Sequence, residues 1–283
     1  MSNSNNINLF QNLKNDNKKI SMITCYDFTF AQIINNSDIN CILVGDSAAM
    51  TMHGHPNTIC ADIAMMEAHT KAVVNGAPDK FVIADLPFLS YRKDLTSNMN
   101  SIHKLMQAGA SAVKLEGADG NLDLIKHIVE SGVPVMGHIG LTPQAVHQLG
   151  GFKVQGKTKS AQDMLKQQAI DLEKAGCFAI VLECVPEDIA KEITNILHIP
   201  TIGIGAGNNT SGQVLVLQDL LGLNKNFKPK FVKKFAQGYD WALNAINNFH
   251  SEVSDKTFPD ADHSFKNSLI NKSQNKIAET QDA

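Results

Sequence analysis

The sequence has almost no arginine: of its 25 basic residues, Arg92 alone is an arginine, and the others are lysines. Planar bidentate clamps on a carboxylate or phosphate are therefore nearly unavailable. An anionic ligand would have to be held by lysine, by backbone N–H groups or through a metal ion. Basic clusters are lacking too, and the formal net charge is −3, so nucleic acid is not an expected partner. We expect Arg92 itself to be a solvated loop residue.

The sequence also lacks any apolar run approaching the roughly 20 residues that a membrane helix needs. Its first residues, MSNSNNINLF, are polar and contain no apolar core of a secretory signal. The five cysteines are odd in number and none is arranged as CxxC, which predicts reduced and mostly buried thiols. We therefore expect a cytoplasmic protein that does not enter a membrane.

What the sequence does contain is a series of short apolar runs, each closed by one acidic residue. The runs are CILVGDS, FVIADLP, SAVKLEG and FAIVLEC, and their acids are Asp46, Asp85, Glu116 and Glu183. Short runs of Val, Ile, Leu and Ala are typical of buried strands, and in parallel α/β folds the C-terminal strand ends face the ligand. The four carboxylates should converge there. Because they would repel each other, we expect a divalent cation among them.

Eight apolar segments predict strands, and helical patterns separate most of them. The predicted strands are Ile20–Cys25, Cys41–Gly45, Phe81–Ala84, Ala112–Leu115, Val133–Gly137, Ala179–Leu182, Thr201–Ile204 and Gln213–Gln218. This alternation indicates a parallel sheet, and acids contributed by many strands favour a closed (β/α)8 TIM-type barrel over an open sheet. We predict one α/β barrel domain over residues 1–265. The polar stretch 266–283 has too few apolar residues to order itself, and we expect a disordered tail.

Several polar residues beside the acids are further candidates for the site. Ser47 can offer a hydroxyl and an N–H group to a ligand. Lys114 and Glu116 stand two apart on one strand, so their side chains point to the same face. His138 follows a glycine at a strand end, where ligand binding and a hydrogen-bonded structural role are nearly equal alternatives.

Two other motifs give weaker signals. His53 and His55 share a loop with glycine and proline, a pattern too weak to predict a zinc site. The segment TIGIGAGNNTSGQ is rich in glycine but lacks the strand–GxGxxG–helix order of a dinucleotide-binding fold. Its spacing fits a phosphate cradle and a plain backbone lining of the pocket equally well.

Taken together, the motifs resemble the ketopantoate hydroxymethyltransferase family. The matching stretches, in family order, are ITCYD, LVGDS, ADLPF, VKLEG, GHIGLTPQ, GGFKVQGK, LECVP, IPTIGIGAG and a late HSF. The resemblance spans roughly residues 8–265 and depends on the combination of motifs. The sequence departs from the family pattern at Cys60, where a proline is usual, and at Ala49, which replaces a glycine.

The resemblance implies a (β/α)8 barrel, a Mg²⁺ ion and the first committed step of pantothenate synthesis. In that step a one-carbon unit passes from 5,10-methylenetetrahydrofolate to 3-methyl-2-oxobutanoate, giving 2-dehydropantoate and tetrahydrofolate. The residues that it implies are Asp46, Asp85 and Glu116 for the metal, Asp46, Ser47, Asp85 and Lys114 for the keto acid, and Glu183 as general base. It also implies a homo-oligomer, which in this family is often a decamer.

Two other functions compete with this one. Mg²⁺-dependent lyases and mutases of the phosphoenolpyruvate mutase and isocitrate lyase type bind 2-oxo acids on a similar barrel, and the GHIGLTPQ and LECVP segments argue against them. A non-catalytic barrel that senses a keto acid is the second alternative. The presence of a base, Glu183, beside three acids of a metal site argues against it.

Overall fold

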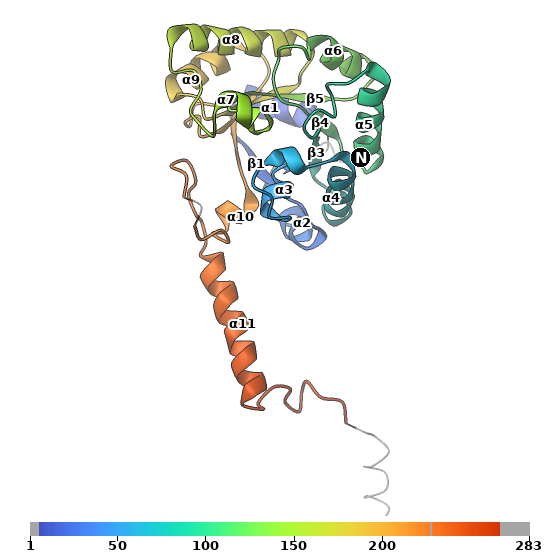
Figure 1. The fold of residues 1–283 in the computed structure, drawn as a ribbon, viewed down its shortest axis with the longest axis vertical. Coiled ribbons are helices and arrows are strands. Elements are labelled where there is room, and N and C mark those ends of the chain that lie inside the picture. Colours follow the sequence, from blue (N-terminus) through green and yellow to red (C-terminus); the bar gives the residue numbers. More distant parts are fainter. Residues whose placement is uncertain (1–5, 227, 267–283) are drawn as a thin grey trace, which may run out of the picture.

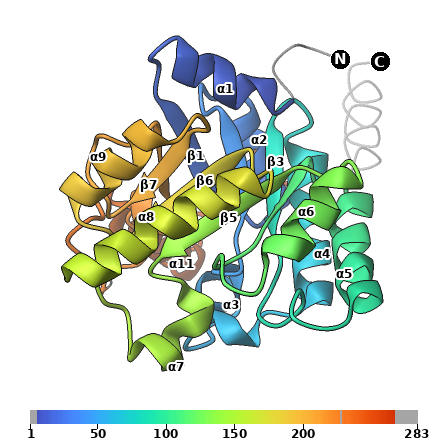
Figure 2. The same cartoon turned by 90° about the horizontal axis from the view of Figure 1, so that it is seen from above.

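The computed structural model describes residues 6–226 and 228–266 of the chain. Its eight strands form a closed barrel in which each strand pairs in parallel with the next, and the last pairs with the first (Figures 1 and 2). The strands are β1 (Ile20–Thr24), β2 (Cys41–Val44), β3 (Phe81–Asp85), β4 (Ala112–Lys114), β5 (Val135–Gly140), β6 (Ala179–Glu183), β7 (Thr201–Ile204) and β8 (Gly212–Leu215). The predicted (β/α)8 barrel is confirmed.

Helices surround most of the barrel. They are α1 (Asn8–Asn15), α2 (Phe28–Asn35), α3 (Ala48–Thr51), α4 (Ile63–Gly76), α5 (Leu95–Gln107), α6 (Leu122–Glu130), α7 (Val146–Leu149), α8 (Lys159–Lys174), α9 (Glu187–Ile196), α10 (Leu217–Leu220) and α11 (Gly238–Ser254), with 3-10 helices η1 (Thr58–Cys60) and η2 (Pro143–Ala145). Several begin at a side-chain cap: Asp27, Asp62 and Asp94 accept backbone N–H groups of α2, α4 and α5. Such caps satisfy donors that the first turn leaves free.

The observed strands differ from the predicted ones mainly at β5 and β8. β5 begins at Val135 instead of Val133, because Pro134 has no N–H to give to the sheet, and it extends to Gly140. His138 therefore lies inside β5, opposite Val181 of β6, and not after the strand end. At β8 the strand ends at Leu215, because the next residues turn into α10.

The two ends of the barrel differ in polarity. Inside the barrel lies an apolar cluster that includes Met22, Ile83 and Val214. At the N-terminal end Phe10 of α1 completes this cluster, and its ring packs edge-on against Phe81 and Phe178 with centroids 5.3 and 5.0 Å apart. The acidic side chains lie at the opposite, C-terminal end, so the barrel opens to a ligand from that end.

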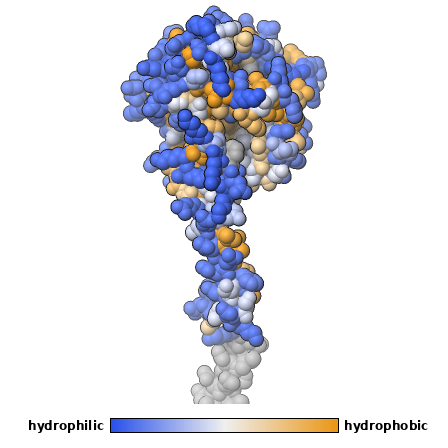
Figure 3. Space-filling model, turned by 60° about the vertical axis from the view of Figure 1, so that its left-hand side comes forward, coloured by the Kyte–Doolittle hydropathy of each residue, from blue (hydrophilic) through white to orange (hydrophobic). Residues whose placement is uncertain are grey.

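The outer helical layer is incomplete beside β7 and β8. The described chain runs from β7 to β8 without a helix, and α10, of 4 residues, is the only helix between β8 and α11. The 17-residue α11 projects away from the barrel, and none of its residues is buried (Figure 1). Apolar side chains show on this projecting segment in Figure 3.

Other sequence expectations have different outcomes. The five cysteines are free thiols, and only Cys60 is exposed. Within residues 6–226 and 228–266 no helix is both long and apolar enough to cross a membrane. The predicted disordered tail lies, apart from Lys266, outside the described residues.

Candidate active site at the C-terminal end of the barrel

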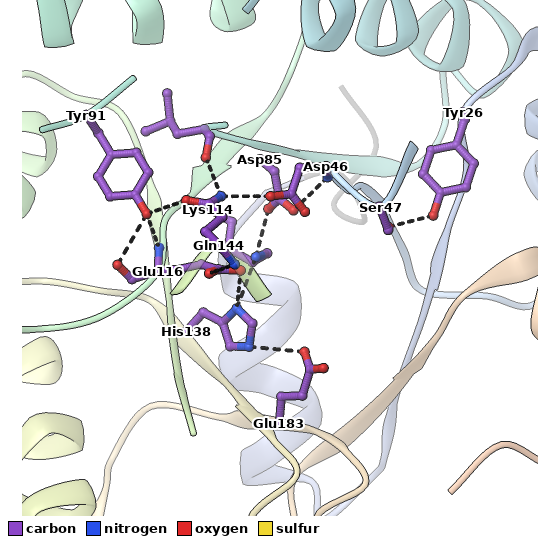
Figure 4. Close-up of polar contacts among 11 residues, drawn as sticks. Tyr26, Asp46, Ser47, Asp85, Tyr91, Lys114, Glu116, His138, Gln144 and Glu183 are labelled. Atoms are coloured by element: carbon purple, nitrogen blue, oxygen red, sulfur yellow. Dashed lines mark hydrogen bonds and ion pairs between the residues drawn. The ribbon is translucent and has the colours of Figure 1, made fainter. Parts of the chain in front are cut away.

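The structure brings all the candidate side chains to the C-terminal rim of the barrel. Asp85, Lys114 and Glu183 are the last residues of β3, β4 and β6. Asp46 and Glu116 each follow their strand by two residues. His138 reaches the same place from β5 (Figure 4). Neighbouring parallel strands end at one rim, which is why short runs far apart in sequence build one site.

Asp85 and Lys114 form a buried ion pair. Lys114 Nζ lies 2.9 Å from Asp85 Oδ1, and each side chain is 4% exposed. Burial acts to lower the pKa of Lys114, but Asp85, Glu116 and Asp46 outweigh it and raise this pKa, so the ammonium stays charged. The second oxygen, Asp85 Oδ2, accepts the Asp46 backbone N–H at 3.1 Å.

Asp46 is buried beside two other acids of the site. Burial, followed by repulsion from Asp85 and Glu116, raises the pKa of Asp46 well above its ordinary value. One hydrogen bond opposes this shift, since Gln144 Nε2 donates to Asp46 Oδ2 at 2.8 Å. A nearby cation would therefore stabilise the ionised form of this carboxyl group.

His138 lies between two carboxylates. Its Nδ1 is 3.3 Å from Glu116 Oε1, and its Nε2 is 3.3 Å from Glu183 Oε2 (Figure 4). Burial and Lys114 act to lower the pKa of His138, but the two glutamates outweigh them and raise it to about 9. Protonation of His138 is thus favoured at neutral pH, with its two ring nitrogens facing the two glutamates.

Glu183 is the most accessible of the acids. Its side chain is 16% exposed, against 4% for Asp85 and Glu116. The next residue, Cys184, has a φ of 49°, in the left-handed region that non-glycine residues rarely adopt. This backbone turn at the residue after Glu183 ends β6. Glu183 is therefore placed to reach a ligand while its neighbours stay enclosed.

Three residues of the site were not among the sequence candidates. The Ser47 and Tyr26 hydroxyls are hydrogen-bonded at 2.8 Å. The Tyr91 hydroxyl donates to Gln144 Oε1 at 2.7 Å. Tyr26 and Gln144 belong to the ITCYD and GHIGLTPQ motifs, which could have drawn attention to them. Tyr91 follows ADLPF by three residues and carries no such signal.

The donor set fits a divalent cation at Asp46 and Asp85. Asp85 Oδ1 is buried and accepts no well-aligned hydrogen bond, despite the nearby Lys114. With all four acids ionised, Lys114 and His138 leave an excess charge of −2, which one divalent cation would neutralise. Oxygen donors of this kind suit a hard cation such as Mg²⁺. Across the described ranges, no group of three or more His, Cys, Asp or Glu side chains is arranged as metal ligands, and Glu116 is turned toward His138 and the Gln144 N–H.

Within the described residues, the side-chain hydrogen bonds of the two weaker motifs join no acid of the cluster. His53 Nε2 and His69 Nε2 are 2.9 Å apart, a contact between two residues and not a three-ligand zinc site. In the glycine-rich loop, a side chain at Gly207 would clash with Glu187, and Asn209 donates to that carboxylate at 3.0 Å. An acid packed against this loop opposes a phosphate there.

Comparison with known proteins places the chain in a family. A family model described as ketopantoate hydroxymethyltransferase matches residues 4–261. The chain belongs to this family. A 3-methyl-2-oxobutanoate hydroxymethyltransferase of Bdellovibrio bacteriovorus is 60% identical over 90% of this chain and 97% of the relative. A protein of the same name from Coxiella burnetii is 59% identical over 88% of this chain and 94% of the relative.

Solved structures of other enzymes share the fold of this hydroxymethyltransferase family member. A phosphonopyruvate hydrolase in complex with oxalate and Mg²⁺ has a TM-score of 0.60 at 10% identity, covering 98% of this chain and 97% of that chain. A 2,3-dimethylmalate lyase has a TM-score of 0.58 at 14% identity, covering 98% of both chains. These likenesses concern the barrel alone. Since the close relatives are named as transferases, the chain is an enzyme and not a non-catalytic sensor.

Proposed function

We propose that this chain transfers a one-carbon unit from 5,10-methylenetetrahydrofolate to 3-methyl-2-oxobutanoate, giving 2-dehydropantoate and tetrahydrofolate. One water molecule is consumed overall. Membership of the ketopantoate hydroxymethyltransferase family supports the reaction. The observation that carries it in the structure is the partly exposed carboxylate of Glu183 beside the buried cation Lys114 at one rim of the barrel.

The keto acid lies against the cation and the oxygen-rich end of the site. In this proposal Ser47 offers its hydroxyl and N–H, and Lys114 attracts the substrate's carboxylate and keto oxygen. Asp46 and Asp85 would hold a Mg²⁺ ion, and Glu116, which contacts His138 and the Gln144 N–H in the structure, would be the third acid of that site. When bound, Mg²⁺ supplies Lewis-acid stabilisation of negative charge on the substrate oxygens.

Glu183 removes the proton from C3 of the keto acid. Its carboxylate must be ionised to act as a base, and Glu183 Oε2 lies 3.3 Å from His138 Nε2. As the proton leaves, electron density moves toward the C2 oxygen, where the charge of Lys114 stabilises it. C3 then attacks the methylene carbon of the folate as the bond from this carbon to one folate nitrogen breaks, and the new carbon–carbon bond creates a quaternary centre. Water replaces the second folate nitrogen on the same carbon, which leaves the hydroxymethyl group on the product and releases tetrahydrofolate.

Deuterium exchange tests this proposal without the folate. With 3-methyl-2-oxobutanoate and Mg²⁺ in D₂O, we expect loss of the C3 proton signal in NMR spectra. EDTA should stop the exchange and excess Mg²⁺ should restore it, and adding methylenetetrahydrofolate should yield 2-dehydropantoate. Cleavage of a 2-hydroxy or phosphono acid by the protein, without exchange at C3, would instead support a lyase of the alternative type.

We also propose a cytoplasmic homo-oligomer, with the decamer as the size that the family resemblance implies. The support comes from α11, which carries Tyr239, Leu243, Ile246, Phe249 and Val253 exposed along one side. An unpacked amphipathic helix beside a barrel that lacks helices over β7 and β8 is suited to packing against a second copy. Small molecules are the only other partners in this proposal.

A further inference from the structure

A cavity of about 880 Å³ adjoins the acid cluster at the same end of the barrel. The loop after β3, the loop after β4, α7 and α8 surround it. Glu116 and Gln144 line this cavity and also belong to the acid cluster, so the two spaces are continuous. The volume is typical of sites for drug-sized ligands of about 300–1,000 Å³. A five-carbon keto acid beside Lys114 leaves most of it free.

The cavity wall combines exposed apolar side chains with side-chain amides. Its largest apolar members include Phe88, Leu89 and Met164, and Leu89 and Met164 are 49% and 57% exposed. Its polar members include Gln148, Gln155 and Gln168. Apolar walls favour the faces of a flat ring, whereas amides pair with the donors and acceptors at its edge. This chemistry matches a heterocycle such as a reduced pterin.

The backbone of Leu89 is an independent sign of a ligand site. Its φ of 58° lies in the left-handed region, which bulky residues rarely adopt. Such conformations cost about 1–3 kcal/mol and concentrate at functional sites. Here the unusual backbone presents a large apolar side chain, half exposed, to the cavity.

The single arginine of the chain lies at the rim of the same cavity. Arg92 is exposed, lines the cavity and donates from Nη1 to the Asp119 carbonyl at 2.8 Å. In the part of the chain that the structure describes, no carboxylate forms an ion pair with it. A guanidinium has five N–H donors, so most of its capacity is left for an anion arriving from solvent.

We propose that this cavity binds the folate co-substrate. The pterin lies between the loop after β3 and α8, its edge meets the glutamine amides, and the carboxylates of the glutamate tail bind Arg92. This orientation directs the methylene carbon toward Glu116 and Gln144, next to the keto acid. The inference rests on the proposed function and adds the location of the second substrate and the direction in which it lies.

A bulky substitution in the cavity tests the location. In Met164→Trp the indole would occupy part of the cavity, and we expect the KM for methylenetetrahydrofolate to rise at least about tenfold, with the KM for the keto acid little changed. The matched control is Gln167→Trp, on the same helix but outside the cavity wall, which should behave like the wild type. C3 exchange without folate shows in each variant whether the keto-acid site is folded.

The outcomes separate this inference from the proposed function. A wild type that neither exchanges C3 nor turns over overturns the proposed function. A wild type that turns over while both tryptophan variants keep its KM for the folate overturns the cavity assignment alone. Met164→Trp could also lose C3 exchange, which would mean that the keto-acid site is disturbed. In that case the smaller change Met164→Phe is titrated with tetrahydrofolate, and a Kd equal to that of the wild type contradicts the proposal.

The rim arginine is tested with a truncated co-substrate. We expect Arg92→Gln to raise the KM for 5,10-methylenetetrahydrofolate about tenfold but not that for 5,10-methylenetetrahydropteroate, which lacks the glutamate. Arg92→Lys should recover part of the loss, because it keeps the charge but not the planar fork. Equal effects of Arg92→Gln on both co-substrates would contradict the assigned direction.

Discussion

The side-chain amide of Gln144 donates a 2.8 Å hydrogen bond to the carboxylate of Asp46, a residue 98 positions earlier in the chain. The Tyr91 hydroxyl donates to Gln144 Oε1, which fixes the amide with its nitrogen toward Asp46. The Gln144 backbone N–H donates to Glu116 Oε2 at 3.0 Å. One residue of a short 3-10 helix therefore positions two of the acids proposed to bind the metal.

Replacing Gln144 by leucine should weaken Mg²⁺ binding without removing any residue proposed to bind the metal. The Asp46 carboxylate and the Tyr91 hydroxyl would each lose a buried partner, and the free energy of unfolding should fall by about 1–3 kcal/mol. Substitution of a residue that orients metal ligands typically lowers metal affinity by about 10–100-fold. The Mg²⁺ concentration that gives half-maximal C3 exchange should therefore rise. Chemical denaturation and a Mg²⁺ titration measure the two effects. An unchanged Mg²⁺ requirement would show that Gln144 serves packing alone.

Replacing Glu183 by glutamine should remove the base and keep the shape of the side chain. We expect turnover to fall by about 10²–10⁴-fold, the usual contribution of a positioned base, while Mg²⁺ and keto-acid binding persist. C3 exchange in D₂O should fall in parallel. Exchange at the wild-type rate would assign proton removal to another residue.

His138 should make the stability of the metal-free protein depend on pH. Its pKa is raised from 6.5 to about 9, so its stabilising contribution is complete below pH 6.5 and is lost as the pH rises through about 9. The difference in Tm between the wild type and His138→Gln should therefore shrink across that range. A difference that stays constant from pH 6 to pH 10, measured by calorimetry, would mean that His138 does not titrate there.

The apolar side of α11 should control oligomeric state. Ile246 is 65% exposed in the described chain, and Ile246→Asp would place a charge in the centre of that side. We expect this variant to form a smaller species than the wild type in size-exclusion chromatography with light scattering. Asn248→Asp, which adds the same charge on the opposite side of the helix, is the control. A monomeric wild type, or equal masses for all three proteins, would rule out α11 as the interface.

The sequence predicted the barrel and the positions of its acids because both depend on local patterns. Asp85 and Glu183 each end a run of apolar residues. Such runs form buried strands of a parallel sheet, whichever strands close the barrel. The family assignment is confirmed by the comparisons, whereas the roles of the individual side chains stay predictions.

The rest of the site depends on loops whose paths are set by tertiary contacts. Gln144 and Tyr91 meet across two such loops, and neither has a periodic pattern that would single it out. Arg92 is exposed as expected, yet its position on a cavity wall depends on the fold of the loop after β3.

The closure of the N-terminal end of the barrel by Phe10 has a consequence for the order of substrate binding. With Phe10, Phe81 and Phe178 filling that end, the buried acids are reached only from the C-terminal opening, into which the 880 Å³ cavity leads. A folate seated in the cavity as proposed would cover the path to the deeper keto acid. We therefore expect sequential, ordered binding, with the keto acid entering first and tetrahydrofolate leaving before 2-dehydropantoate. Product inhibition by 2-dehydropantoate should accordingly be competitive with the keto acid alone.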